Sequence, residues 1–503
     1  MSAAHPLLAA FPLVPALPLA AAAFIALRML TGRATGDAAE PATARLAQLA
    51  ALLPLLLLLP MLAGGILAGY PGRVLYGEWL QAGPVSLPIA LLADAKSLVF
   101  ATLVQLVGWI TLRFSRTYLH REAAYHRFFA GLCLFLGGMQ LIVLAGDAAL
   151  MFVGWELVGF ASWLLIGYDT ARPVATGNAI HAFVTNRIGD AGFLLGLALA
   201  FLWVGSTAWP AIGEMAAGGG LDKVSARMLL FGFFIAAVAK SAQLPLSGWL
   251  ARALEGPTPS SAIFYGAIMV HAGVWMLIRL ETVLRVVPDI MVQVALFGLA
   301  TALYGWFTGL TQTDVKSSLA SATLTQVGLM FLACGLGFFD LAFVHLCLHA
   351  VLRAAQFLLA PSYMHLLTVP PPAPPRWLAG RVRWYGAALA RLWLEPLAQA
   401  MVVRPAQAVG RDLRALDDRV LVALLAPSDD SLAGGGRSVG GRLLAVASGF
   451  CAAIEDRLTQ MAASGRPAQM MRQACDYFLE LEALLERPRY LLVLIAATFM
   501  VIL

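Results

Sequence analysis

The sequence predicts an all-α membrane protein with about eleven to twelve transmembrane helices, and three observations lead to that class. Of its 503 residues, 60% are hydrophobic and only 12% are charged. Its mean hydropathy is +0.80. Apolar runs of about 20 residues, the length that crosses a bilayer as a helix, recur along the chain. Soluble domains hold roughly 45–50% apolar and about 25% charged residues, so this composition argues against a soluble enzyme.

Eleven apolar runs have the length of a membrane-crossing helix. The first run lacks the basic residue that precedes the apolar core of a signal peptide, so we interpret it as a transmembrane helix. A twelfth candidate, residues 490–503, is short and follows Pro488, which leaves its crossing open. The eleven runs are residues 7–30, 46–69, 89–112, 128–145, 149–168, 179–204, 228–250, 260–280, 290–310, 317–338 and 341–359.

Basic residues in the short loops predict the orientation, because cytoplasmic loops hold an excess of Arg and Lys. Arg33 and Arg45 follow the first run, and four arginines between 113 and 127 follow the third. The loops after the second and fourth runs hold only Arg73 and no basic residue, respectively. We therefore expect a multi-pass protein of the bacterial inner membrane, with its N-terminus outside and everything after Ala360 in the cytoplasm.

The character of the chain changes after the eleventh run. The segment VPPPAPP at residues 369–375 predicts a stiff linker, and apolar and Arg positions then alternate at helical spacing over residues 377–425. That Arg-rich region either docks a cytoplasmic partner or lies on anionic lipid headgroups. We divide the chain into four parts: 1–125, the first three transmembrane helices; 126–362, the core; 363–489, the Arg-rich cytoplasmic region with its linkers; and 490–503, a C-terminal apolar helix.

Two charged residues lie in the middle of apolar runs, where a charge is costly and marks a functional hypothesis. Glu156 lies near the centre of the fifth run and Lys240 lies in the seventh, five residues before Pro245. The proline predicts a broken helix, whose freed backbone groups need water or polar partners. The pair is either a static ion pair that joins two helices or a hydrated site that exchanges protons.

Other ionisable residues extend this pattern. Arg187 and Asp190, three residues apart, form either a structural pair or part of a proton relay. His345, His349 and Arg353 recur every four residues and therefore share one helix face. Histidine carries a proton near neutral pH and arginine does not release one, so the row is either a relay that ends at a fixed charge or a polar staple between helices.

Three more polar residues occur in or beside the apolar runs, and the sequence leaves their roles open. Tyr265 and His271 lie six residues apart on different faces of the eighth run, and His271 either lines a path or packs. Lys316 begins the tenth run, near the cytoplasm or in a hydrated pocket.

The five cysteines lie far apart without a CxxC pair, so we expect no metal, no cofactor and no catalytic chemistry in this chain.

These segments resemble the antiporter-like subunits of respiratory complex I and the Mrp-type Na+/H+ antiporters, a family of proton-conducting membrane transporters. The resemblance runs from about Phe100 to Ala360. It implies a helical bundle with inverted repeats and a row of polar residues at the membrane midplane. The matching stretches are GWELVGFASWLLIG, HAFVTNRIGD, AKSAQLPLSGWLARALEGPTPSSA, QTDVKSSLASATLTQVGLMFLACGLG and HLCLHAVLRAAQFLLA.

The resemblance also implies roles for individual residues. It places Glu156 and Lys240 on the family's Glu and Lys, and His345 and His349 on its histidines. A further group falls on motif positions: Arg187, Asp190 and Lys316.

The chain departs from the family pattern at three points. Arg353 stands where the family has its central lysine. Tyr265 stands where the family has a histidine, with His271 as a substitute one and a half turns later. A second broken helix with its own lysine is not found before the VPPPAPP linker, so we expect a truncated second inverted repeat.

The resemblance implies a membrane subunit that translocates H+ or Na+ within a hetero-oligomeric complex. The shortened second half favours the DabA and DabB type inorganic-carbon uptake complexes, in which a DabB-like subunit works with a large cytoplasmic, zinc-dependent DabA-like partner. One alternative is a proton-pumping subunit of a complex I-like NADH-quinone oxidoreductase or membrane hydrogenase. Another is a non-conducting membrane anchor. Membrane lipid is the expected environment, and nothing in the sequence indicates a nucleic acid partner.

Overall fold

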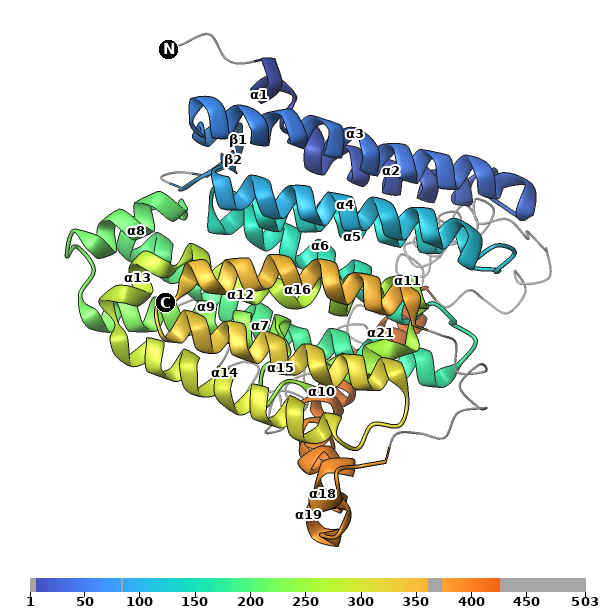
Figure 1. Cartoon of the computed structure of the whole chain (residues 1–503). Helices are drawn as coiled ribbons and strands as arrows, with labels where there is room; N and C mark the ends of the chain where they lie inside the picture. Colours follow the sequence, from blue (N-terminus) through green and yellow to red (C-terminus); the bar gives the residue numbers. More distant parts are fainter. Residues whose placement is uncertain (1–5, 83–84, 361–372, 426–503) are drawn as a thin grey trace, which may run out of the picture. The chain divides into compact units, whose positions relative to one another are not determined.

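The computed structural model describes residues 6–82, 85–360 and 373–425, which are mostly helical. Ten helical segments of this described part are long and apolar enough to cross a membrane. Most of these long helices lie side by side (Figure 1). The prediction of an all-α, multi-pass membrane protein is thereby confirmed. The ten segments are Leu7–Leu30, Asp37–Ala68, Ala95–Tyr118, Tyr125–Leu144, Ala148–Ile166, Pro173–Val204, Thr258–Arg279, Pro288–Gly309, Val315–Gly335 and Phe339–Leu359.

The eleventh expected crossing accounts for the difference from the sequence-based count. It corresponds to helix α9 (Lys223–Lys240), whose 18 residues include three basic ones, Lys223, Arg227 and Lys240. Helix α9 nevertheless packs along the long helix α7. The twelfth candidate, residues 490–503, lies outside the described residues.

The N-terminal helices pack against one another through small and apolar side chains. Helix α2 contacts α3 and α5, and α3 also contacts α4. Two prolines, Pro54 and Pro60, lie inside α3. The elements of this region are α1 (Pro6–Ala10), α2 (Leu13–Leu30), the 3-10 turn η1 (Asp37–Ala39), α3 (Glu40–Ala68), α4 (Ala95–Tyr118) and α5 (Tyr125–Leu144).

A β-hairpin connects α3 to α4, where the sequence analysis expected a loop and the start of a helix. Strands β1 (Gly72–Ala82) and β2 (Val85–Ala93) are antiparallel, from the pair Gly72–Ala93 to the pair Ala82–Val85. The predicted helical run 89–112 therefore begins as strand. Asp94 ends the strand and caps α4, because its carboxylate accepts a hydrogen bond from the amide of Ser97 at 2.7 Å.

The next helices form the scaffold of the candidate site. Asp147 and Asp222 cap α6 and α9 in the same way as Asp94 caps α4. Isolated bridges join Leu91 to Ala145 and Asp147 to Ala208, so β2 and α8 lie near these helix ends. We call this end of the molecule, with β1, β2, α8 and α13, the hairpin end (Figure 1). The elements are α6 (Ala148–Ile166), α7 (Pro173–Val204), α8 (Trp209–Ala217) and α9 (Lys223–Lys240).

The predicted break in the seventh run is confirmed. Helix α9 ends at Lys240, a turn with a cis peptide between Leu244 and Pro245 follows, and α10 begins at Gly248. The following crossing is irregular too, because a π-helical turn and a 3-10 turn interrupt it. Its elements, with those that flank it, are α10 (Gly248–Arg252), η2 (Ala253–Glu255), α11 (Thr258–Ser261), η3 (Ala262–Ala267), η4 (Met269–His271), α12 (Ala272–Arg279) and α13 (Glu281–Val286).

Three regular helices complete the membrane part. Helix α14 (Pro288–Gly309) packs along α15 (Val315–Gly335), which in turn contacts α16 (Phe339–Leu359). Helix α16 also contacts the irregular turn η3 and the earlier helix α4. It therefore brings the predicted histidine row next to the interrupted crossing.

The predicted amphipathic stretch 377–425 is divided into several helices, most of them short, with a longer one at its end. A turn with positive φ at Arg391, Leu392 and Trp393 separates α19 from α20. Contacts divide the chain into one unit that ends at Gln399 and a second that begins at Ala400. The elements are α18 (Arg376–Ala379), α19 (Val382–Leu389), η5 (Arg391–Trp393), α20 (Leu394–Ala398), η6 (Gln399–Val403) and, in the second unit, α21 (Arg404–Leu425).

Candidate functional site

The first group of predicted residues forms a partly buried cluster between α6, α7 and α9. Arg187 of α7 lies at its centre and pairs with two acids. Its Nη1 donates to Oε2 of Glu156 on α6. Its Nε lies 2.8 Å from Oδ2 of Asp190, three residues later on the same helix. The predicted Arg187–Asp190 pair is present, and Glu156 joins it.

Lys240 completes this cluster from the last residue of α9. Its side chain is fully buried, and Nζ donates to the backbone carbonyl of Trp155 at 3.2 Å. Nζ also lies 4.9 Å from the centre of the Trp155 ring, within the range of a cation–π contact. The carboxylate of Glu156 is paired with Arg187, and the structure does not join it directly to Lys240.

A glycine creates the space that the two cations share. A Cβ atom placed on Gly159 would lie 2.9 Å from Nη2 of Arg187 and 3.5 Å from Nζ of Lys240. Gly159 follows Glu156 by three residues, so both belong to the same side of α6. Two cations and two carboxylates therefore lie close together where α6, α7 and α9 pack, and their formal charges cancel.

Trp155 contributes to this cluster through its indole ring and through its backbone carbonyl. The indole N–H donates to Oδ1 of Asp190 at 2.8 Å, while the backbone carbonyl accepts from Lys240. The sequence analysis named neither Trp155 nor Gly159. Trp155 directly precedes Glu156, and Gly159 follows it by three residues. This closeness in the sequence is the signal that could have identified them.

The second group, on α16, is only partly a continuous row. His349 and Arg353 are in contact, since Nε of Arg353 donates to Nε2 of His349 at 3.5 Å. The other ring nitrogen, Nδ1 of His349, lies 3.0 Å from Nε2 of His271. When His349 is neutral, its proton is therefore on Nδ1 and is donated to His271. The three side chains form one directed chain of hydrogen bonds.

His345 lies at the other end of the row and faces a different partner. Its Nε2 is 2.8 Å from Oε1 of Gln326 on α15. The ring centres of His345 and His349 are 6.3 Å apart, so a proton would need water to pass between them. Gln326 lies in the motif stretch around Lys316 but was not singled out by the sequence.

The remaining two predicted residues lie apart from both groups. Tyr265 donates its hydroxyl hydrogen to the carbonyl of Leu250 and stacks on Phe357, with ring centres 5.0 Å apart. Lys316 donates to Oγ1 of Thr258 at 2.6 Å, and the Tyr118 hydroxyl lies 2.9 Å from the same oxygen. His271, rather than Tyr265, therefore contacts the α16 row.

The break after α9 connects the two groups. Ser241 directly follows Lys240, and its hydroxyl donates to the carbonyl of Val270 at 2.6 Å. Val270 directly precedes His271. The close packing depends on Gly273, where a Cβ would lie 2.4 Å from Oγ of Ser241. One hydrogen bond thus links the backbone neighbours of Lys240 and His271.

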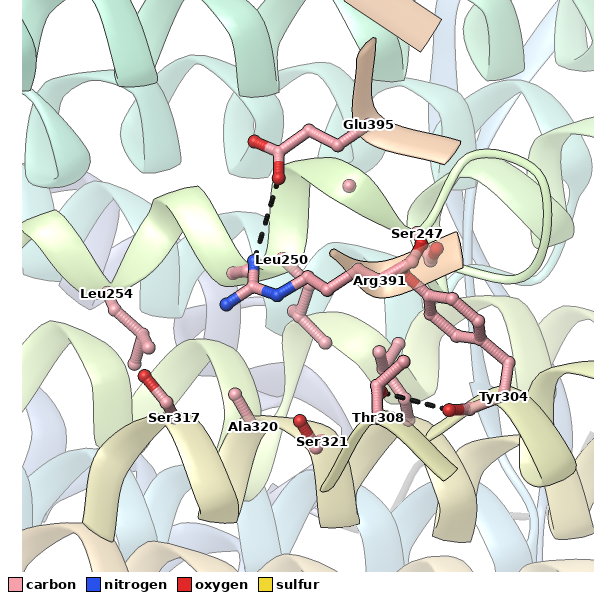
Figure 2. Close-up of a pocket in the computed structure, with 13 residues that line it drawn as sticks. Ser247, Leu250, Leu254, Tyr304, Thr308, Ser317, Ala320, Ser321, Arg391 and Glu395 are labelled. Atoms are coloured by element: carbon pink, nitrogen blue, oxygen red, sulfur yellow. Dashed lines mark hydrogen bonds and ion pairs between the residues drawn. The ribbon is translucent and has the colours of Figure 1, made fainter. Parts of the chain in front are cut away.

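A small cavity with both polar and apolar lining residues lies beside α10, which follows the break after Lys240. Its volume is about 20 Å³, enough for roughly one water molecule. Arg391 extends across it and pairs with Glu395 at 3.7 Å (Figure 2). Glu395 also pairs with Arg252 at 2.7 Å. The lining includes Ser247, Tyr304, Thr308, Ser317 and Ser321.

The same segment reaches α7. Oε1 of Gln399 lies 2.7 Å from Nδ1 of His181, which precedes Arg187 by six residues. Residues 391–399 therefore cover α10 and the adjacent part of α7.

No cluster of three or more histidine, cysteine, aspartate or glutamate side chains suited to a metal ion occurs in residues 6–82, 85–360 and 373–425.

Comparison with family models gives two matches. The model described as the transmembrane region of NADH:quinone oxidoreductase and Mrp antiporter matches residues 145–368. The model described as the N-terminus of chain 5 of NADH-ubiquinone oxidoreductase (complex I) matches residues 79–129. Together they cover the hairpin from residue 79 onward, helix α4 and the helices of both residue groups, including α16.

Curated relatives give the same picture over part of their length. NADH-quinone oxidoreductase subunit L of Mycobacterium tuberculosis is 37% identical over 293 residues, which are 58% of this chain and 46% of that protein. NAD(P)H-quinone oxidoreductase chain 5 of Synechocystis sp. is 36% identical over 292 residues, 57% of this chain and 43% of that protein. The chain spans less than half the length of these relatives.

Two solved structures share the fold. The Mrp complex from Dietzia sp. contains a chain with a TM-score of 0.59 and 27% identity, matched over 69% of this chain and 37% of that chain. An archaeal membrane-bound sulfane sulfur reductase contains a chain with a TM-score of 0.59 and 21% identity, over 69% and 70%. The second likeness concerns the fold alone.

Proposed function

Because the chain belongs to the antiporter-like family of complex I and Mrp membrane subunits, we propose that it translocates protons within a multi-subunit membrane complex. The single observation that carries this proposal is the cluster of Glu156, Arg187, Asp190 and Lys240 at the break of α9, in which Asp190 and Lys240 are buried. Two unit charges 4 Å apart interact by about 4 kcal/mol at an effective dielectric of 20. The gain or loss of one proton therefore changes the preferred pairing of every member.

Arg187 is the part of the cluster suited to transmit such a change. It contacts both Glu156 and Asp190, so when one acid is protonated the guanidinium stays paired with the other acid, which is still charged. Lys240 is the exchangeable cation, because an ammonium releases a proton and a guanidinium does not. Its position at the C-terminus of α9 also suits the charged form, since unpaired carbonyls gather at a helix end.

From Lys240 the path continues, in this proposal, to the second group. The hydrogen bond from Ser241 to Val270 places His271 next along the backbone, and His271 leads to His349 and Arg353. A non-conducting anchor would need neither a lysine nor a histidine chain in its interior. Arg353 provides a fixed positive charge at the end of the path. We extend the proposal to the assignment of residues 126–362 as the ion-path core.

The names of the relatives favour a respiratory or Mrp-type complex over an inorganic-carbon uptake complex. Those relatives are subunits of NADH- and NAD(P)H-quinone oxidoreductases and a chain of an Mrp complex. We therefore place the complex I-like assignment first, with H+ as the ion and Na+ as the competing ion. The DabB-like assignment, with a DabA-like zinc partner, stands second.

We further propose a bacterial inner-membrane location with the N-terminus outside. The positive-inside distribution supports this orientation, which places the hairpin end outside and residues 391–399 on the cytoplasmic side. The Arg-rich region 363–489 would then face a cytoplasmic partner.

Purification from the native membrane tests the assembly. Mass spectrometry of the intact complex should find flavin or iron–sulfur subunits, or other Mrp-type membrane subunits, with this chain. A large zinc protein instead would favour carbon uptake. Recovery of the chain alone would contradict a multi-subunit function.

Reconstitution of the same preparation into liposomes tests the transport. An imposed potassium diffusion potential should drive proton flux, read with a trapped pH-sensitive dye. Glu156→Gln should reduce that flux at least tenfold, while Glu214→Gln on α8 serves as a matched control. Equal flux in both variants would favour a membrane anchor.

A further inference from the structure

Beyond the two residue groups, one helix carries a polar column toward the hairpin end. His271, Trp275 and Arg279 follow at intervals of four residues through η4 and α12, so they lie on one face. The guanidinium of Arg279 lies 4.2 Å from the centre of the Trp275 ring. His271 contacts His349 at the opposite end of this column. The column therefore begins at the histidine row.

Trp275 has a buried N–H group without a partner. Its side chain is fully buried, and its Nε1 finds no hydrogen-bond acceptor among the described residues. An unpaired buried donor is destabilising, because folding removes its hydrogen bonds to water without replacing them. Its aromatic neighbours, Phe100 of α4 and Phe343 of α16, have ring centres 5.3 and 6.0 Å away. A phenylalanine would fill this place without the cost, so the N–H is suited to an acceptor that enters the column, such as water.

The column ends at an ion pair beside an open hollow. Nη2 of Arg279 donates to Oδ1 of Asp94 at 3.1 Å and also to the hydroxyl of Ser97. Burial alone would raise the pKa of Asp94, but the hydrogen bonds and charge of Arg279 hold it below its usual value. The hollow has a volume of about 340 Å³, and its lining includes Asp94, Lys96, Arg279, Glu281 and Thr282.

Charged side chains surround the hollow on several elements. Lys96 of α4 lies 2.6 Å from Asp340 of α16 and 4.0 Å from Glu281 of α13. Arg285 pairs in turn with Glu281 at 2.8 Å. Both acids and bases are thus present where water reaches the bundle, as an exchange point for protons requires.

We propose that the column His271–Trp275–Arg279, with the hollow at Asp94, is the branch through which the histidine row exchanges protons with the hairpin side. The inference rests on the proposed function. In it, water donates and accepts along the column, and the Trp275 N–H positions that water. Arg279 admits water while its fixed charge opposes the free passage of cations.

Trp275→Phe is the sharpest test, because it removes the N–H and keeps an aromatic ring. Flux is measured with the full complex in liposomes, by the dye method given above, and thermal stability is measured in parallel. The matched control is Trp209→Phe, since the Trp209 N–H is already satisfied by the carbonyl of Ala145 at 3.2 Å. We expect Trp275→Phe to reduce proton flux about tenfold at unchanged melting temperature, and Trp209→Phe to lower stability with unchanged flux.

A second variant covers the case in which Trp275→Phe assembles poorly. Thr282→Cys places a thiol in the hollow, and a bulky, membrane-impermeant cationic reagent should label it and reduce flux relative to the unlabelled variant. Unchanged flux in Trp275→Phe, or in fully labelled Thr282→Cys, overturns the branch.

A reference variant separates this result from a failure of the proposed function. Lys240→Ala must abolish flux if the chain conducts protons at all. Flux that survives Lys240→Ala contradicts the proposed function, whereas flux lost in Lys240→Ala and kept in Trp275→Phe contradicts only the column.

Discussion

The two buried residue groups differ in how their positive charges are balanced. At the break of α9, Arg187 and Lys240 face two carboxylates, Glu156 and Asp190. On α16, Arg353 contacts His349, and no ion pair between Arg353 and an acid occurs in the described part of the chain. His349 and Arg353 are buried, whereas the side chains of Glu156 and Arg187 are 32% and 34% exposed. The two groups therefore differ in counter-charges and also in exposure.

This difference separates an exchange site from a barrier. In the first group, carboxylates compensate the cations, so the cluster tolerates one proton more or less. In the second, a permanent guanidinium repels any further positive charge that approaches, by an energy of the order of 4 kcal/mol at 4 Å and an effective dielectric of 20. We infer that protons reside at the α9 break and pass the α16 row only briefly.

A large combined effect on stability and flux is expected from Arg187→Ala, which removes the shared partner of two acids. Loss of one partner from a fully buried ion pair costs about 3–5 kcal/mol, and the cost is smaller here because Arg187 and Glu156 are about a third exposed to solvent screening. The variant should unfold at lower temperature and lose proton flux by about 100-fold. Thermal unfolding in detergent and flux in liposomes check this. Stability and flux like those of the wild type would mean that the cluster is not electrostatically coupled.

Gly159→Ala should have the next largest effect, about tenfold on flux. The new methyl group would lie 2.9 Å from Arg187 and must displace it or Lys240. Gly177→Ala on α7 is the matched control, because nothing lies within 4 Å of the added methyl group. Flux equal to that of the control would show that the shared space beside α6 is not needed.

Arg353→Lys sharpens the comparison from the other side. An ammonium keeps the positive charge but releases a proton, so the barrier on α16 should become an exchange site. We expect flux to rise about threefold, with unchanged assembly. A fall in flux would mean that the row requires the planar guanidinium for its contact with His349, rather than for its inability to release a proton.

The smallest expected effect on flux concerns Asp147, which caps α6 at the hairpin end. Its Oδ1 accepts from the Leu150 amide at 2.9 Å, and burial raises its pKa to about 6 from an ordinary value of 3.8. Between these values the folded state holds a proton that the unfolded state releases, so stability decreases as the pH rises through this range.

Asp147→Asn preserves the cap without a titratable group. It should remove that decrease from pH-dependent thermal unfolding and leave flux unchanged. A decrease of the same size in the variant would assign the pH dependence to another group.

Much of the membrane fold could be predicted from the sequence, because helix length and apolar content determine it locally. Pro245 likewise predicted the break after Lys240, since a proline in a helix interior removes a backbone hydrogen bond. The rule is not general, because Pro54 and Pro60 lie inside the continuous helix α3. The hairpin at residues 72–93 escaped prediction. Its second strand, VSLPIALLA, is as apolar as a membrane helix and lacks the alternation that marks a half-buried strand.

The chemistry of the site was predicted less completely than its location. Glu156 and Lys240 stand out because a charge in an apolar run is rare, but their partners depend on which helices meet. Arg187 pairs with Glu156, and the backbone carbonyl of Trp155 accepts a hydrogen bond from Lys240, because α6, α7 and α9 pack together. Gly159 acts through the space beside it, and Trp275 through its unpaired N–H. Neither hydropathy nor residue spacing reveals such features.

Proton flux of Lys240→Ala against Lys223→Ala tests the central claim most directly. Both lysines belong to α9, one buried at its last residue and one exposed at its first. With the intact complex in liposomes and equal amounts of folded protein, we predict flux lost in Lys240→Ala and kept in Lys223→Ala. Equal flux in the two variants would contradict proton exchange at the break of α9.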